Sequence, residues 1–188
     1  MKLLIVVDMQ KDFIDGALGS PEAQAIVPNV KKMIEEYQAA GEDVIFTLDT
    51  HDEKYMETQE GKNLPVPHCI RGTDGWELDS ALKEFQGKRF EKNTFGSTAL
   101  MEYVQERPYE SVMLIGVCTD ICVISNALLV KAAIPEVPVL VDSSCCAGVS
   151  PESHENALNA MKMCTLPYSK RRIGEGGLRD GTANIDCG

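Results

Sequence analysis

The chain of 188 residues has the composition of one globular domain, with 44% hydrophobic and 25% charged residues. Its 18 basic and 29 acidic residues give a formal net charge of −11. This charge argues against nucleic acid or an anionic membrane as the main partner, because both bind basic surfaces. The longest apolar runs, at 3–7 and 137–141, are too short to span a bilayer. We therefore expect neither a nucleic-acid nor a membrane partner.

The N-terminus and the cysteines indicate the compartment. The first residues lack the long apolar centre and the cleavage pattern of a secretory leader, which predicts a cytoplasmic protein. The seven cysteines are an odd set without regular spacing or a CxxC pair, unlike a disulfide framework or a structural zinc site. Most of them are expected to be reduced thiols, either buried or reactive. The seven are Cys69, Cys118, Cys122, Cys145, Cys146, Cys164 and Cys187.

Short β-branched runs alternate with segments of helical period. Strands are predicted over 3–7, 44–48, 89–91, 111–115 and 137–141. Apolar positions 30, 33, 34 and 37 predict a helix that begins at Pro28 and ends at Gly41, and positions 78, 81, 82 and 85 predict a second. Further helices are expected after Ser97, near Thr119 and from Ser150. This alternation predicts an α/β fold, a parallel sheet covered by helices on both faces.

The C-terminal part of the chain differs in composition. Residues 164–168 are a candidate last strand, which Pro167 confines to a sheet edge because proline cannot donate a backbone hydrogen bond. From Lys170 onward the chain is rich in glycine and basic residues and has few apolar residues. We therefore expect one domain over 1–169 and a loose tail over 170–188.

Reactive side chains follow several of the predicted strands. In an open parallel sheet, ligands bind beyond the carboxyl ends of the strands. An aspartate directly after a strand more often caps the next helix. The coincidence of several such groups on one edge nevertheless favours a site. These groups are Asp8, Asp49, His51, Lys92, the residues 118–122 and the residues 142–146.

Cys122 is the best-placed candidate nucleophile. If Thr119 caps the following helix, Cys122 lies in the first turn, where the helix dipole lowers a thiol pKa. An equally weighted alternative is that Cys122 is a small core residue at the start of a buried helix. Cys145 and Cys146 follow another strand with no helix start directly after them, and we expect them to be packing residues.

Histidine is scarce, and the three histidines suggest different roles. Asp49 and His51 lie on the same side of an extended segment, and His68 could join them as a two-histidine, one-carboxylate metal site. Taken alone, this pattern is more often an ordinary polar loop. His154 lies in the first turn of the last predicted helix, and we expect it to be solvated.

Three segments carry a resemblance to a known family. They are VVDMQKDF at 6–13, FEKNTFGS at 90–97 and GVCTDICV at 116–123. With these motifs in this order, the chain resembles the isochorismatase-like cysteine hydrolases. DTH at 49–51 and PHCIRGTDGWEL at 67–78 make it most similar to the nicotinamidases (pyrazinamidases) within that family. The resemblance implies a three-layer α/β/α fold with a mainly parallel sheet of about six strands.

The resemblance also implies roles for the catalytic residues. Cys122 would be the nucleophile, Asp8 the general base and acid, and Lys92 the group that positions and charges this pair. The backbone N–H groups of Cys118 and Cys122 would form the oxyanion hole, with a cis peptide before Cys118. Such a site would hydrolyse a small amide through a thioester.

For the metal and the substrate pocket, the resemblance implies a second group of residues. Asp49, His51 and His68 would hold one divalent metal, with zinc favoured over iron or manganese. Phe13 would form an aromatic wall for the substrate ring, and Trp76 is a further candidate. The resemblance also implies that the protein can form a homo-oligomer.

The function expected from the resemblance is conversion of nicotinamide to nicotinic acid and ammonia, which feeds NAD salvage. A related alternative is hydrolysis of another small amide, such as an N-carbamoyl compound, maleamate or ureidoacrylate. A third is a non-catalytic α/β protein in which Cys118 and Cys122 sense oxidants. Against the sensor stands the complete set of Asp8, Lys92 and Cys122, since a sensor needs no charged partners of this kind.

Overall fold

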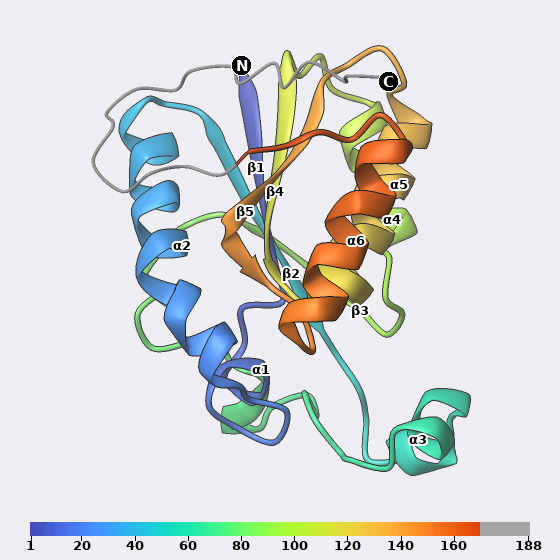
Figure 1. Cartoon of the computed structure of the whole chain (residues 1–188). Coiled ribbons are helices and arrows are strands. Elements are labelled where there is room, and N and C mark those ends of the chain that lie inside the picture. The colour runs from blue at the N-terminus through green and yellow to red at the C-terminus, as the bar shows by residue number, and fades with distance from the viewer. Residues whose placement is uncertain (170–188) are drawn as a thin grey trace.

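Six parallel strands form the centre of the computed structural model, which describes residues 1–169 (Figure 1). Their order across the sheet is β3-β2-β1-β4-β5-β6. All five neighbouring pairs are parallel, as the sequence predicts. The strands are β1 (Lys2–Val7), β2 (Asp43–Asp49), β3 (Lys88–Lys92), β4 (Ser111–Val117), β5 (Val139–Ala147) and β6 (Tyr168–Ser169).

Helices cover both faces of this sheet and give the expected three-layer fold. In Figure 1, α2 lies on one face, whereas α4, α5 and α6 lie on the other. The short helices α1 and α3 lie beyond the carboxyl ends of the strands. The helices are α1 (Lys11–Ile14), α2 (Pro21–Ala39), α3 (Gln59–Asn63), α4 (Thr98–Gln105), α5 (Ile124–Ala133) and α6 (Pro151–Met163). None of the helices within residues 1–169 has the length and apolar character needed to cross a bilayer.

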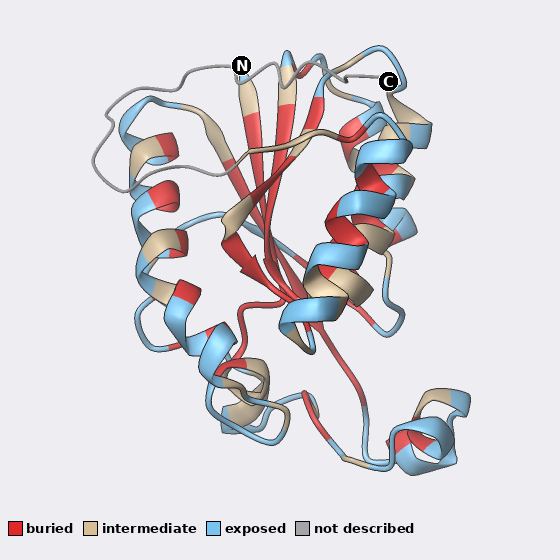
Figure 2. Cartoon of the chain, in the orientation of Figure 1, coloured by how far each residue is buried: buried red, intermediate tan, exposed pale blue. Residues whose placement is uncertain are grey.

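The hydrophobic core fills the space between the layers. Every residue from Leu3 to Val7 of β1 is completely buried. Burial on both faces explains why this strand is a continuous apolar run rather than an alternating one. Figure 2 shows the buried residues on the strands and on the inward sides of the helices. The sheet is therefore a closely packed platform for the residues that follow its strands.

Helix α2 begins earlier than the sequence analysis expects. The apolar spacing after Pro28 predicts a start there, whereas the helix starts at Pro21. The Ser20 side chain accepts a hydrogen bond from the Ala23 backbone N–H. Pro28 lies inside the helix, where proline typically costs about 3 kcal/mol. Burial of Ala23 and Ile26 on the same face as the later apolar residues offsets that cost. The predicted stop at Gly41 is confirmed by its φ of 71°.

The helix predicted over 78–85 is wrong. Leu78 instead forms an isolated antiparallel bridge with Gln10, and the following residues form turns. The Asp79 backbone N–H donates to the Met9 carbonyl, and its side chain accepts from the Ala81 N–H. Leu78 and Leu82 are buried all the same, because tertiary contacts rather than a helix bring their side chains inward.

Strand β5 is longer than predicted and β6 is shorter. Residues 142–146 continue β5 rather than following it, so Asp142 does not lie at the carboxyl edge. Its carboxylate accepts hydrogen bonds from the Ser144 N–H and the Ser169 hydroxyl. The predicted edge strand is confirmed as Tyr168–Ser169, next to β5. The tail expected over 170–188 lies outside the described residues.

The sheet has a topological switch point between β1 and β4. The crossover from β1 leads to β2 on one side, whereas the later strands β4, β5 and β6 lie on the other side. In open α/β sheets, ligands bind beyond the carboxyl ends of the strands at such a switch point. Gly116 allows the two strands to approach there: its φ is 119°, and a Cβ would lie 2.1 Å from the Val7 carbonyl oxygen. The sheet thus brings Asp8 near the turn that carries Cys122.

Candidate active site

Three strands of the sheet, β1, β3 and β4, position Asp8, Lys92 and Cys122 at their carboxyl ends. Asp8 directly follows β1 and adopts a positive φ of 48°. Lys92 is the last residue of β3, and Cys122 lies in the one-turn π-helix (Thr119–Val123) after β4. All three side chains are buried. The carboxyl edge of the sheet therefore gathers residues that are far apart in the sequence, as the predicted strand ends imply.

The Lys92 ammonium group lies at the centre of this arrangement. Its Nζ is 2.7 Å from Asp8 Oδ2 and 3.5 Å from Cys122 Sγ. A second carboxylate oxygen, Asp49 Oδ1, is 3.3 Å away. One cation thus contacts the candidate base, the candidate nucleophile and a candidate metal ligand.

Burial and charge together set the proton affinities of these groups. Burial would lower the pKa of Lys92, but the charges of Asp8, Cys122 and Asp49 raise it, so the ammonium stays charged. Burial raises the pKa of Asp8, and Lys92 opposes that shift. Burial, together with the Asp8 charge, also raises the pKa of Cys122 well above its usual value. The resting site therefore contains a thiol beside a buried carboxyl group with a raised proton affinity.

The raised pKa of Cys122 corrects the prediction that a helix N-terminus lowers it. The cap of the turn is Cys118, not Thr119, and the turn is a π-helix. At full burial, the loss of hydration outweighs the dipole of one helical turn. The expected cis peptide between Val117 and Cys118 is present. Asn126 holds the turn by donating its side-chain N–H to the Cys122 carbonyl at 2.8 Å.

A second cluster contains the three predicted metal ligands. Asp49 Oδ2 lies 3.1 Å from His51 Nε2 and 3.4 Å from His68 Nε2. His51 and His68 come together because the residues around them pair: the His51 N–H donates to the Cys69 carbonyl, and the Arg71 N–H donates to the His51 carbonyl. The structure thus brings together a histidine pair separated by a long loop.

Glu60 is a fourth member of the cluster that sequence reasoning missed. It lies in α3, and its Oε1 is 3.7 Å from both His51 Nε2 and His68 Nε2. The potential ligand atoms of Asp49, His51, Glu60 and His68 all lie within 4.8 Å of one another. Several acidic residues lie between the two histidines in the sequence, and nothing in their spacing distinguishes Glu60.

These four side chains fit a divalent metal. Tetrahedral coordination with bonds of about 2.0–2.1 Å places ligands roughly 3.3 Å apart, close to the distances in the cluster. The His68 ring is held by a 2.8 Å contact between Nδ1 and the Val66 carbonyl, which leaves Nε2 for the cluster. Burial acts to raise the pKa of Asp49, but His51, His68 and Lys92 hold it well below its usual range. Asp49 is therefore ionised, as a metal ligand must be.

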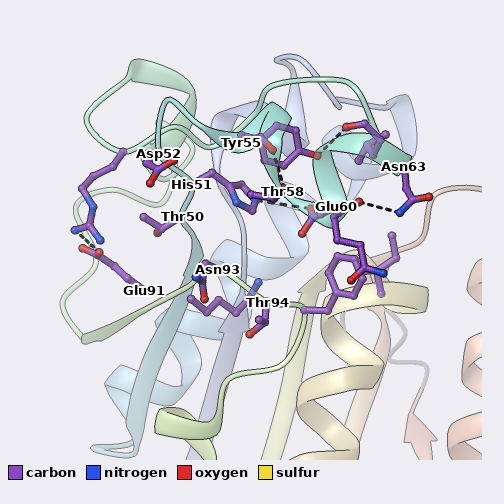
Figure 3. Close-up of a pocket in the computed structure, with 16 residues that line it drawn as sticks. Thr50, His51, Asp52, Tyr55, Thr58, Glu60, Asn63, Glu91, Asn93 and Thr94 are labelled. Atoms are coloured by element: carbon purple, nitrogen blue, oxygen red, sulfur yellow. Dashed lines mark hydrogen bonds and ion pairs between the residues drawn. The ribbon is translucent and has the colours of Figure 1, made fainter.

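A cavity of about 1110 Å³ opens beside the cluster and reaches Lys92. Figure 3 shows His51 and Glu60 pointing toward each other, with Asn93 and Thr94 on the opposite side of the cavity. Tyr55 packs behind both histidines, with ring centroids 4.7 Å from His51 and 5.0 Å from His68. The arrangement can present a polar substrate to the metal ligands and to Lys92 at once.

The two predicted aromatic residues lie near the cluster but not in the lining of this cavity, as far as the described residues show. The Phe13 ring is half-buried, with its centroid 5.4 Å from that of His68. Trp76 is also half-buried and donates its indole N–H to the Thr50 hydroxyl at 2.9 Å. The aromatic side chains that line the cavity are Tyr55 and Phe95. Substrate contacts by Phe13 and Trp76 stay predictions.

The remaining candidates have structural environments. His154 is not simply solvated, because its Nδ1 lies 2.7 Å from the buried Thr119 hydroxyl. Cys145 and Cys146 are buried packing residues, as expected. Burial raises the pKa of Cys118 to about 12. All six described cysteines carry free thiols, whereas Cys187 lies outside the described residues.

Comparison with known proteins places this site in a family. The model of the isochorismatase domain matches residues 2–170. The chain belongs to the isochorismatase family. A Bacillus subtilis protein described as an uncharacterized isochorismatase family protein is 31% identical over 172 residues, covering 84% of this chain and 92% of that protein.

Solved structures of this family share the architecture. A pyrazinamidase/nicotinamidase from Streptococcus mutans has a TM-score of 0.80 and 30% identity, covering 90% of this chain and 100% of that one. A pyrazinamidase of Pyrococcus horikoshii in complex with zinc has a TM-score of 0.79 and 29% identity, covering 90% and 99%. The isochorismatase family and these relatives indicate an amidohydrolase.

Proposed function

We propose that this isochorismatase-family protein is a metal-dependent nicotinamidase that converts nicotinamide to nicotinic acid and ammonia. The observation that carries the proposal is the position of Lys92, which contacts Asp8, Cys122 and the metal-ligand residue Asp49 within 3.5 Å. The zinc-bound pyrazinamidase relative supports zinc as the metal. Nicotinic acid made in this way would enter NAD salvage.

Asp8 and Cys122 would carry out the chemistry. Asp8 accepts the Cys122 proton while the sulfur attacks the carboxamide carbon, and the backbone N–H groups of Cys118 and Cys122 stabilise the oxyanion. Asp8 then gives the proton to the departing ammonia, which leaves a thioester. Water attacks the thioester with Asp8 again as base, releasing the acid and restoring the thiol. The raised pKa of both groups suits this exchange, because a single proton can pass between them.

Lys92 would stay charged throughout and compensate the negative charge that moves between Asp8 and Cys122. Asp49, His51, Glu60 and His68 would hold the metal. When bound, the metal supplies Lewis-acid contacts that orient the substrate ring. Phe13, which packs against His68, and Trp76 would contact that ring. In this proposal the metal cluster orients the substrate, whereas Asp8 and Cys122 cleave the amide bond.

The polar lining of the cavity favours a second candidate, another small polar amide. The lining includes Asp52, Asn63, Asn93 and Arg71, which can hydrogen-bond a polar substituent beyond the amide. An N-carbamoyl compound or ureidoacrylate would use the same Cys122 chemistry.

The test is release of ammonia from nicotinamide by the purified protein, with and without a metal chelator. Cys122→Ala is the catalytic control, and Cys164→Ala, at an exposed thiol outside the site, is its matched control. We expect turnover that disappears with the chelator and in Cys122→Ala but not in Cys164→Ala. Turnover by Cys122→Ala would refute the thiol mechanism. Absence of turnover in wild-type protein containing metal would refute nicotinamide as substrate and favour another small amide.

A further inference from the structure

Thr47 contacts both the side chain and the backbone of Asp8. Its hydroxyl donates to Asp8 Oδ1 at 2.6 Å. In return, the Asp8 backbone N–H lies 3.2 Å from both the hydroxyl oxygen and the carbonyl oxygen of Thr47. Thr47 is completely buried, as is Asp8. Side chain and backbone of the candidate base are thus both held by one residue of the neighbouring strand.

The sheet fixes this contact. Thr47 is opposite Val7 in the parallel register of β1 and β2, so Asp8 is the first residue beyond the paired segment. There the backbone of Asp8 turns into the left-handed region, with φ of 48°. A non-glycine residue in that region needs support from its surroundings. The Thr47 hydroxyl and carbonyl oxygens supply that support to the Asp8 N–H.

The two carboxylate oxygens of Asp8 have different partners. Oδ1 accepts a hydrogen bond from the Thr47 hydroxyl, whereas Oδ2 forms a 2.7 Å ion pair with the Lys92 ammonium. Cys122 Sγ lies 3.5 Å from the same ammonium. With Oδ1 occupied, Oδ2 is the oxygen left to take the thiol proton.

We propose that Thr47 is a positioning residue of the hydrolase, which occupies Oδ1 of Asp8 and aims Oδ2 at the Cys122–Lys92 pair. This inference rests on the proposed role of Asp8 as base, but not on nicotinamide as substrate. Without the hydroxyl, the carboxyl group can rotate, and the buried carboxylate loses its neutral hydrogen-bond donor. Proton transfer from Cys122 then becomes slower, although substrate binding is unchanged.

Two substitutions separate the hydroxyl from the volume of Thr47. Thr47→Val keeps the shape and removes the hydroxyl, whereas Thr47→Ser keeps the hydroxyl. Tyr109→Phe is the matched control, because Tyr109 is also buried and its hydroxyl donates to an aspartate, Asp43, at 2.8 Å. Asp43 begins the same strand, β2, at the end away from the site. This control measures the loss of a buried hydroxyl–carboxylate contact that does not touch Asp8.

The first readout is the rate at which iodoacetamide alkylates Cys122, followed by mass spectrometry of the peptide that contains it. This rate needs no substrate and depends on removal of the thiol proton. We expect Thr47→Val to slow alkylation of Cys122 by about 10- to 100-fold, Thr47→Ser to stay within about threefold of wild type, and Tyr109→Phe to have no effect. Metal content and thermal unfolding are measured on each variant.

The second readout is steady-state hydrolysis of whichever amide the wild-type protein turns over. In Thr47→Val, kcat should fall by the same factor while KM changes by less than about threefold. Equal alkylation rates in Thr47→Val and wild type would overturn the proposal. A loss of bound metal in Thr47→Val that is large enough to explain slower alkylation of Cys122 would also overturn it. If Asp8→Asn leaves alkylation of Cys122 unchanged, Asp8 is not the base and the proposal fails with it. Failure on nicotinamide with the alkylation pattern intact would refute only the substrate.

Discussion

Replacing Lys92 by methionine tests the central contact of the site. Methionine matches most of the aliphatic length of lysine but leaves Asp8 and Asp49 without the cation that lies 2.7 and 3.3 Å from them. Both carboxylates are buried. The variant therefore isolates the charge of Lys92 from its packing.

The expected loss follows from these distances. At an effective dielectric constant of about 20, unit charges at the two separations of 2.7 and 3.3 Å attract by about 6 and about 5 kcal/mol. The variant will not lose this full sum, because Asp8 can escape by binding a proton. Removal of one partner of a buried pair costs about 3–5 kcal/mol in practice. We expect Lys92→Met to lower the free energy of unfolding at pH 7 by this amount and to lower kcat/KM by about 10³-fold.

The direction in which the stability of the variant changes with pH is a more specific test than the size of the loss at pH 7. Burial already raises the pKa of Asp8, and loss of Lys92 raises it further. Above about pH 3.9, the ordinary pKa of aspartate, the unfolded chain has lost the Asp8 proton, whereas the folded variant keeps it up to the raised pKa of Asp8. Between these two values the free energy of unfolding of the variant falls as pH rises. The stability gap between wild type and variant, measured by urea unfolding, should therefore narrow as pH drops from 7 toward 4. A gap independent of pH, or activity within tenfold of wild type, would refute the reasoning.

Two further predictions concern the metal cluster and the base. Glu60→Gln should weaken metal binding at least about 10-fold, measured by competition with a chromophoric chelator, whereas Glu57→Gln at an exposed position of the preceding turn should not. Unchanged affinity in Glu60→Gln would remove it from the ligand set. Because Asp8 must be unprotonated to accept the thiol proton and burial raises its pKa, kcat/KM should fall on the acid side with an apparent pKa above about 3.9. An acid limb at or below that value would contradict the assignment of Asp8 as base.

The sequence by itself determined the layers of the fold and most of the candidate site. Continuous apolar runs such as 3–7 identify buried parallel strands, because both faces of such strands are covered. Residues directly after these runs share one edge of the sheet, which places Asp8, Lys92 and Asp49 together before any coordinates are known. The cap and proline at Ser150 likewise predict the start of α6, where the structure has a reciprocal capping box.

The tertiary structure decided what depends on contacts between distant segments. Pro28 stays inside α2 because the helix buries a face that begins at Ala23, and residues 78–85 form turns because Leu78 pairs with Gln10. Glu60 joins the histidines, and Thr47 holds Asp8, only after the chain has folded. The raised pKa of Cys122 has the same origin, since local helix position favours the thiolate but complete burial removes its hydration. Periodicity records local preferences, whereas proton affinity and ligand geometry are set by neighbours that the sequence order does not reveal.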